Sequence, residues 1–241
     1  MRSGRRFAPA IGLCAFLLAC GDSAQLHPSA VSVLTVTSAP TPLSTPPNAP
    51  SPAKAWICTD APATPLTPEL RGEQETWVRR TVLMSRDRRI AAIIIDKTGY
   101  TLHLYERGKR TRSYPVQLGL DPVNDKIMEG DCRTPEGVYR IIASRRPPKT
   151  AYARAFLLDY PNFHDYADFI AMRHRTHELS LDARIGDNIL IHGGGENARG
   201  DAQDGWNWTK GCIALSDENI QDLSRHVRVG TPVTIVRELN R

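Results

Sequence analysis

Short apolar runs separated by turn residues recur along the chain from residue 90 onwards. Residues 90–96 are almost wholly apolar, residues 100–106 alternate apolar with polar positions, and Lys97-Thr98-Gly99 lies between them as a hairpin turn. Further strand patterns occupy residues 110–119, 137–144, 188–192 and 231–238. Their lengths and spacing predict a small, mostly β domain with a few short helices.

Two segments have the pattern of helices. Residues 72–84 predict one short helix. Ser216 is a good N-cap for a second helix from Asp217, whose apolar face carries Ile220, Leu223 and Val227. The segment 147–187 is less regular and rich in His, Tyr and Asp, so it is either a flap over a site or a long surface excursion.

The N-terminus has the features of an export signal. Residues 1–19 carry three arginines and no acid, followed by an apolar run at 11–19 that is too short to span a bilayer. The sequence around Cys20, Leu-Leu-Ala-Cys-Gly, resembles the bacterial lipobox, in which the cysteine is acylated and begins the mature chain. The alternative is an ordinary signal that is cleaved near Ala19. We expect lipidation of Cys20 and a membrane anchor without a spanning helix.

Residues 20–68 predict a disordered tether. Ten of the eighteen prolines lie between Gly21 and Pro68, among Ser, Thr and Ala, and such a segment cannot bury enough apolar surface to fold. The folded domain is therefore expected over residues 69–241. Gly21 after the lipidated cysteine favours the outer membrane, and the location expected for the domain is the periplasm.

Charge and cysteine content narrow the function further. Without the three leader arginines the formal charge falls from +5 to +2, and no basic helix is present, so a nucleic-acid partner is not expected. Three cysteines remain beyond Cys20, and an odd number leaves at least one thiol unpaired. If a disulfide forms, we expect it between Cys58 and Cys132, which leaves Cys212 as the free thiol.

The segment 189–215, ILIHGGGENARGDAQDGWNWTKGCIAL, holds the candidate chemistry. A thiolate is a strong nucleophile but needs a base or a positive field beside it at neutral pH. His192 at the end of an apolar strand is the candidate base, and a backbone carbonyl near Gly193 could fix its tautomer. Gly211 leaves amides free for an oxyanion, while Lys210 and the following helix would favour the thiolate. The alternative is that Cys212 is a small buried apolar residue of a core strand.

These motifs together resemble the YkuD-type L,D-transpeptidase family. The resemblance rests on a strand that ends in His-Gly, a glycine-rich loop, and Thr-x-Gly-Cys-Ile-x-Leu before a capped helix. Upstream, GDCRTPEGVYRI and DYPNFHDYA are similar to further family elements, so the likeness runs from about Ile90 to Arg237. It implies a β-sandwich-like catalytic domain without a metal or cofactor that acts on peptidoglycan stem peptides.

By position, the resemblance implies that Cys212 is the nucleophile, that His192 is the base and that Gly193 orients the imidazole. Thr209, Lys210 and Gly211 would line the oxyanion and substrate site. Lys210 and Ala214 depart from the residues common in the family, which puts the acceptor in doubt. A hydrolase on the same scaffold and an inactive wall-binding lipoprotein remain alternatives, and a monomer is expected.

Other polar and aromatic residues have weaker interpretations. His174 and His177 have a spacing that could place two metal ligands on one helix turn, but no further ligand completes a set, so surface histidines are expected. Trp206 and Trp208 precede the Cys motif and either pack or contact substrate.

Overall fold

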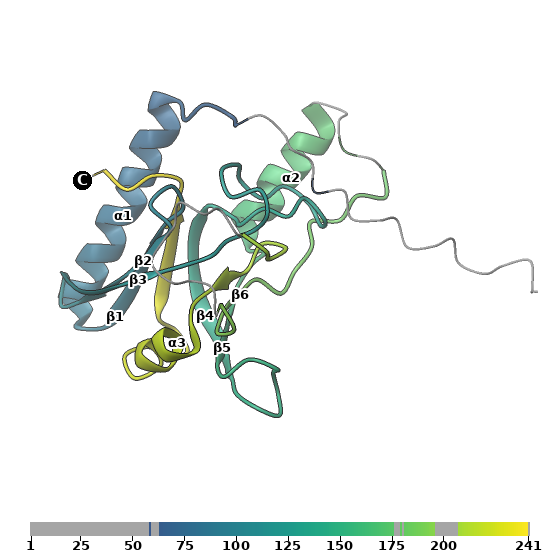
Figure 1. Cartoon of the computed structure of the whole chain (residues 1–241). Helices are drawn as coiled ribbons and strands as arrows, with labels where there is room; N and C mark the ends of the chain where they lie inside the picture. Colours follow the sequence, from purple (N-terminus) through teal and green to yellow (C-terminus); the bar gives the residue numbers. More distant parts are fainter. Residues whose placement is uncertain (1–57, 59–62, 176–178, 180, 196–206, 241) are drawn as a thin grey trace, which may run out of the picture. The chain divides into compact units, whose positions relative to one another are not determined.

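The structure, a computed structural model, describes residue 58 and residues 63–175, 179, 181–195 and 207–240. The leader, Cys20 and most of the tether lie outside these ranges. Within them, eight strands form one sheet in the order β3-β2-β1-β8-β4-β5-β6-β7, accompanied by three helices (Figure 1). The mostly β prediction is confirmed.

Helices and strands are interspersed along the chain. The helices are α1 (Pro68–Arg88), α2 (Phe163–Arg175) and α3 (Asp217–Leu223). The strands are β1 (Ala91–Asp96), β2 (Thr101–Glu106), β3 (Lys109–Pro115), β4 (Gly137–Arg145), β5 (Ala155–Leu158), β6 (Leu190–His192), β7 (Ile213–Ala214) and β8 (Pro232–Val236). In the described ranges no helix has both the length and the apolar character that a membrane span requires.

The centre of the sheet explains the apolar run at 90–96. β1 pairs antiparallel with β2 and parallel with β8, so both of its edges are hydrogen-bonded. Ile93 and Ile95 face the main hydrophobic core, and Ile94 is also fully buried because α1 packs against β1, β2, β4 and β8. A strand covered on both faces has no polar side to alternate with.

Helix α1 is much longer than the predicted helix at 72–84. It begins after the N-cap Thr67, whose hydroxyl accepts from Leu70 N, and it ends at Arg89 in the left-handed conformation. Its buried residues are polar: Gln74, Thr81 and Ser85. They hydrogen-bond to the sheet, for example Thr81 to Thr234 across 2.6 Å. Because these buried positions are polar, no apolar stripe in the sequence indicates where this helix begins and ends.

The sheet curls so that residues beyond β3 meet β7. The backbone N–H of Gln117 donates to Ala214 O at 2.9 Å, and Ala214 N–H donates back to Gln117 O at 2.8 Å. Residues from both halves of the sheet, such as Leu102 and Ile191, share one core cluster. This closure brings the segment after β3 alongside the strand that follows Cys212.

The segment 147–187 contains regular structure that sequence patterns did not predict. It holds β5, which pairs with both β4 and β6 in the interior of the sheet, and helix α2. A description of this segment as only a flap or surface excursion is wrong. The short run Ala-Phe-Leu-Leu in β5 is buried on both sides and therefore gives no alternation.

The end of the tether is fastened to the domain. Cys58 and Cys132 form a disulfide, as expected if one forms. Thr64 N–H donates to Asn124 Oδ1 at 2.8 Å, and its carbonyl accepts from the Arg237 guanidinium. Contacts of the folded part thus reach closer to the N-terminus than the expected boundary at residue 69.

Candidate active site

His192 ends β6 and is held in a single tautomer. Its side chain is buried, and Nδ1 lies 2.6 Å from the carbonyl oxygen of Gly193. A carbonyl can only accept, so Nδ1 carries the proton and Nε2 keeps its lone pair. Burial lowers the pKa of His192, while the Gly193 contact opposes this effect. The imidazole is therefore neutral at pH 7 and ready to take a proton.

Gly193 is tightly enclosed by the start of α3. A Cβ at this position would lie 2.3 Å from Asp217 Oδ1 and 3.0 Å from Ile220 Cγ2. The same Asp217 oxygen accepts from Gly194 N–H at 2.8 Å. The expected carbonyl partner of His192 is thus fixed by the helix that Ser216 caps, with Ser216 Oγ accepting from Asn219 N–H.

Cys212 is the free cysteine among the described residues. Its thiol donates to Asn188 O at 3.6 Å, and Asn188 has a left-handed φ of 59° just before β6. Burial raises the pKa of the Cys212 thiol, while the Leu190 backbone amide and the charge of Lys126 oppose the rise. The expected effect of Lys210 and the helix on the thiolate does not appear as a lowered pKa of the thiol, because burial is the largest effect.

Strand pairing brings Cys212 and His192 to neighbouring strand ends. β6 and β7 are parallel, with His192 opposite Ala214. Cys212 comes directly before β7, and its thiol hydrogen-bonds to the carbonyl of Asn188, which lies just before β6. Among the described contacts there is no direct hydrogen bond between the two, and in ligand-free sites such bonds are commonly long.

Tyr152 packs against the imidazole. Its ring stacks on that of His192, with centroids 3.9 Å apart and planes inclined by 18°. Burial raises the pKa of Tyr152, and the charge of a Cys212 thiolate raises it further. No sequence motif marks Tyr152, which comes from the loop between β4 and β5.

Thr209 shapes the turn that carries Cys212. Its hydroxyl donates to Cys212 O at 2.7 Å and accepts from Gly211 N–H at 3.2 Å. The Gly211 amide is therefore engaged within the turn, and the expectation that it is free for an oxyanion is wrong. Thr209 is buried, and its two hydrogen bonds stabilise the turn. Lys210, between them, is exposed.

Gly211 allows the turn to lie against a neighbouring loop. Its φ is +126°, and a Cβ there would lie 2.4 Å from Arg133 O. That loop is the GDCRTPEG segment, which the disulfide at Cys132 ties to the N-terminal side of the domain. Arg133 itself pairs with Asp121, Nε to Oδ2, at 2.8 Å. The turn that carries Cys212 thus packs against a loop that a disulfide and an ion pair hold in place.

Trp208 lies on the exposed side of the site. Its indole Nε1–H donates to Gln117 Oε1 at 2.8 Å, and its ring meets His192 edge-on at 5.7 Å between centroids. The side chain is still 42% exposed, so it both packs and presents a surface beside the imidazole. Trp206 and His177 lie outside the described residues, and His174 is exposed. In the described ranges no three His, Cys, Asp or Glu side chains gather as a metal site.

Comparison with known protein families shows to which family the chain belongs. A model of the L,D-transpeptidase catalytic domain, YkuD, matches residues 90–235. The chain is a member of the L,D-transpeptidase family. The match includes β6 with His192, the Cys212 turn and most of the sheet. No curated protein sequence matches this L,D-transpeptidase chain.

Solved structures similar to this L,D-transpeptidase include two of greater length. Bd1075 from Bdellovibrio bacteriovorus is 24% identical over 62% of this chain and 49% of its own, with a TM-score of 0.44. The helical cell shape determining protein Pgp2 from Campylobacter jejuni is 23% identical over 69% of this chain and 56% of its own, with a TM-score of 0.46. The chain spans about half the length of these two proteins. An L,D-transpeptidase from Mycobacterium smegmatis is 17% identical over 61% of this chain and 58% of its own, with a TM-score of 0.39.

Proposed function

We propose that this chain is a cysteine L,D-transpeptidase that acts on peptidoglycan stem peptides. The observation that carries the proposal is the free thiol of Cys212 directly before β7, the strand that pairs with β6, where Gly193 fixes the tautomer of the neutral imidazole of His192. A nucleophile, a base and a group that orients the base are the parts that acyl transfer through a thioester requires.

In the first half-reaction, Cys212 Sγ attacks the carbonyl carbon of the third stem residue. His192 Nε2 takes the thiol proton as the carbon–sulfur bond forms, because a thiol with a raised pKa is protonated at rest. The tetrahedral oxyanion forms beside the turn, where the Cys212 N–H is the proposed donor now that Thr209 holds the Gly211 N–H. Collapse breaks the carbon–nitrogen bond, and His192 returns its proton to the departing amine.

In the second half-reaction, an amine attacks the thioester. His192 Nε2 takes a proton from the attacking nitrogen, and the sulfur leaves and is reprotonated. Water in place of the amine would give hydrolysis. Trp208 and Lys210 are proposed to contact the peptides, since both are exposed next to the reacting groups.

The proposal includes the location of the enzyme. Lipidation at Cys20 and the Pro-rich segment would attach the domain to a membrane in the periplasm, with the outer membrane favoured, and let it reach the wall over a distance that the tether sets. Intact mass of the membrane-extracted protein, with a diacylglycerol-type adduct at Cys20 that Cys20→Ala removes, tests this part separately.

The reaction is tested with tetrapeptide fragments of peptidoglycan, with and without an added amino acid as the acceptor. A thioester adduct on the intact protein, absent in Cys212→Ala, and an exchanged product with acceptor present are expected. His192→Ala should lower the rate about 10²–10⁴-fold. Accumulation of free tripeptide regardless of acceptor would identify a hydrolase, and no adduct with any fragment would reject the enzymatic proposal.

A further inference from the structure

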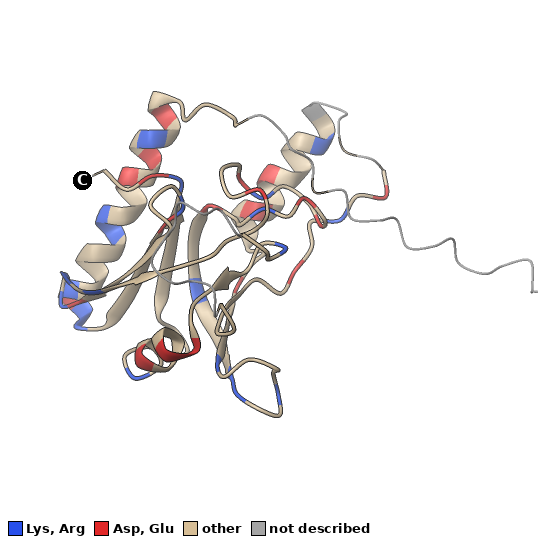
Figure 2. Ribbon diagram, viewed as in Figure 1, with Lys and Arg blue, Asp and Glu red and all other residues tan. Residues whose placement is uncertain are grey.

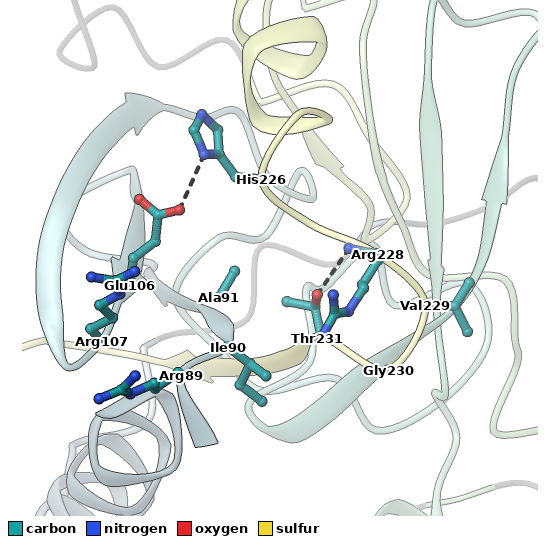
Figure 3. A pocket seen from close by; sticks show the side chains of 10 residues that line it. All are labelled: Arg89, Ile90, Ala91, Glu106, Arg107, His226, Arg228, Val229, Gly230 and Thr231. Atoms are coloured by element: carbon teal, nitrogen blue, oxygen red, sulfur yellow. Dashed lines mark hydrogen bonds and ion pairs between the residues drawn. The ribbon is translucent and has the colours of Figure 1, made fainter. Parts of the chain in front are cut away.

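A cavity lies among residues that take no part in the site around Cys212. Its volume is about 470 Å³, and three chain segments line it: the junction of α1 with β1, the turn between β2 and β3, and the connection from α3 to β8 (Figure 3). This volume is in the range of small-molecule pockets. The third segment comes more than a hundred residues after the first two, so the cavity is a product of the fold.

Each of the three segments contributes an arginine: Arg89, Arg107 and Arg228. In the part of the chain that the structure describes, none of these guanidinium groups has an ion pair or a side-chain hydrogen bond. By contrast, Arg133 and Arg237 are each paired with a carboxylate. The wall of the cavity therefore holds three arginines and one acid, Glu106, and this excess of positive charge gives it a positive potential.

The acid in the wall, Glu106, does not balance them. Its carboxylate accepts from the Thr111 hydroxyl at 2.9 Å and lies 3.2 Å from His226 Nδ1 and 3.9 Å from Arg112 Nη1. Figure 3 shows the carboxylate of Glu106 turned to the imidazole of His226. The described contacts of Glu106 are thus to other groups than the three arginines, and its single charge offsets only part of theirs.

Two of the arginines stand in a backbone conformation that disfavours side chains. Arg89 has a φ of 53° and Arg107 a φ of 54°, both in the left-handed region. Arg89 follows the last residue of α1, a position where glycine is usual. A non-glycine residue there costs free energy. Two of the three arginines therefore stand at positions where the backbone conformation favours glycine.

The surroundings add positive charge. Arg88 ends α1, and Lys109 and Arg110 begin β3, next in sequence to the arginines of the cavity. Figure 2 shows Lys and Arg gathered at this end of α1 and of the β2–β3 hairpin. Charges of one sign around a concave site raise the local concentration of the opposite ion.

We propose that this cavity is an anion site that binds a phosphate group, carried by a small molecule or by a lipid headgroup. Guanidinium groups match phosphate oxygens with paired, charge-assisted hydrogen bonds. Three arginines supply more donors than the two oxygens of a carboxylate can use, which favours a phosphate with its several free oxygens. Ile90 and Val229 line the same cavity and offer apolar contact to the carbon part of the ligand.

The test is titration of the full chain with inorganic phosphate and pyrophosphate, followed by calorimetry, and in parallel co-sedimentation with vesicles of zwitterionic lipid with and without an anionic phospholipid. The variant Arg107→Gln/Arg228→Gln removes two charges of the cavity. The matched variant Arg79→Gln/Arg80→Gln removes two exposed charges from α1, away from the cavity.

We expect saturable binding of pyrophosphate that weakens about tenfold or more in the cavity variant and less than twofold in the matched variant. Vesicle binding that follows the same pattern would identify a lipid headgroup as the source of the phosphate, and pyrophosphate binding without it would identify a soluble ligand. Equal weakening in both variants, or no saturable binding of either probe by the wild-type chain, would overturn the proposal and leave a solvated basic surface.

Discussion

The ring of Tyr152 lies parallel to the imidazole of His192, 3.9 Å away between centroids and tilted by 18°. The stack restricts tilting of the imidazole ring, and the hydrogen bond from Nδ1 to the Gly193 carbonyl fixes the direction in which its nitrogens point. The proposed base is thus positioned by a side chain from a loop that lies about forty residues earlier in the sequence.

Two substitutions of Tyr152 distinguish the contribution of its ring from that of its hydroxyl. Tyr152→Phe keeps the stack, and we expect the rate of Cys212 acylation to fall less than threefold. Tyr152→Ala removes the stack, which is worth about 0.5–1.5 kcal/mol, and should lower that rate up to about tenfold. Acyl-enzyme formation on the peptide fragment measures both. If Phe and Ala slow the reaction equally, the hydroxyl matters and the stack does not.

The thiol of Cys212 should be protonated at rest. Burial raises its pKa and lowers that of His192, so the pair is neutral at pH 7. The rate of alkylation by iodoacetamide should therefore rise with a midpoint above about 8.5, the ordinary value of a cysteine. His192→Ala should leave this midpoint nearly unchanged while it slows acylation by peptide. A midpoint near 6 in the wild-type chain would mean a resting ion pair instead.

The glycine before Cys212, the proposed nucleophile, is required for steric reasons. Gly211→Ala places a Cβ 2.4 Å from Arg133 O at a φ of +126°, so the turn must move. We expect a loss of about 2 kcal/mol or more in unfolding free energy and loss of acylation at Cys212. Gly230→Ala is the control, since its φ is also positive, at +89°, but nothing lies within 4 Å of its Cβ. It should cost about 1 kcal/mol and leave acylation intact.

The patterns that sequence analysis predicted correctly are local. β1 and β2 follow from an apolar run and an alternating run with a turn between them, and α3 begins after the N-cap Ser216. The length of α1 was missed because its buried contacts are polar. β5 was missed because a four-residue strand with neighbours on both sides has neither length nor alternation.

The residues of the candidate site also fall into two groups, those that sequence motifs indicate and those that only the fold brings to the site. Cys212, His192 and Gly193 stand in motifs, and the carbonyl partner of His192 follows from its place at a strand end. Tyr152 and Asn188 reach the site through tertiary contacts, so no spacing indicates them. The engagement of Gly211 N–H by Thr209 is a turn geometry that residue type alone does not specify.

The disulfide should stabilise the domain strongly. Cys58 and Cys132 are 74 residues apart, and closing a loop of this length restricts the unfolded chain by about 4 kcal/mol. Cys58→Ala/Cys132→Ala should lower the unfolding free energy by this order in denaturant titrations. Reduction should have the same effect on the wild-type chain and on Cys212→Ala. An unchanged denaturation midpoint on reduction would mean that the bond contributes nothing to stability.

Asp125 should make the stability of the folded chain fall as the pH rises, because its pKa is raised in the folded state. Burial raises its pKa to about 7, the nearby Glu136 adds to the rise, and the charge of Lys97 opposes it. Lys97 is itself engaged, since its Nζ donates to Glu136 Oε1 at 2.9 Å. The folded state therefore holds the Asp125 proton more tightly than the unfolded chain, whose aspartates titrate near 3.9.

The contribution of the protonated Asp125 is complete below about pH 4 and is lost as the pH rises to about 7, because the unfolded chain gives up its proton first. Asp125→Asn cannot ionise, so between pH 5 and pH 8 its unfolding free energy should rise relative to the wild-type chain by about 2 kcal/mol. Denaturant titrations at several pH values measure this difference. Asp87→Asn, at an exposed position on α1, should follow the wild-type curve. Parallel curves for Asp125→Asn and the wild-type chain would show that Asp125 is ionised in the folded state at pH 5, with Lys97 compensating its charge.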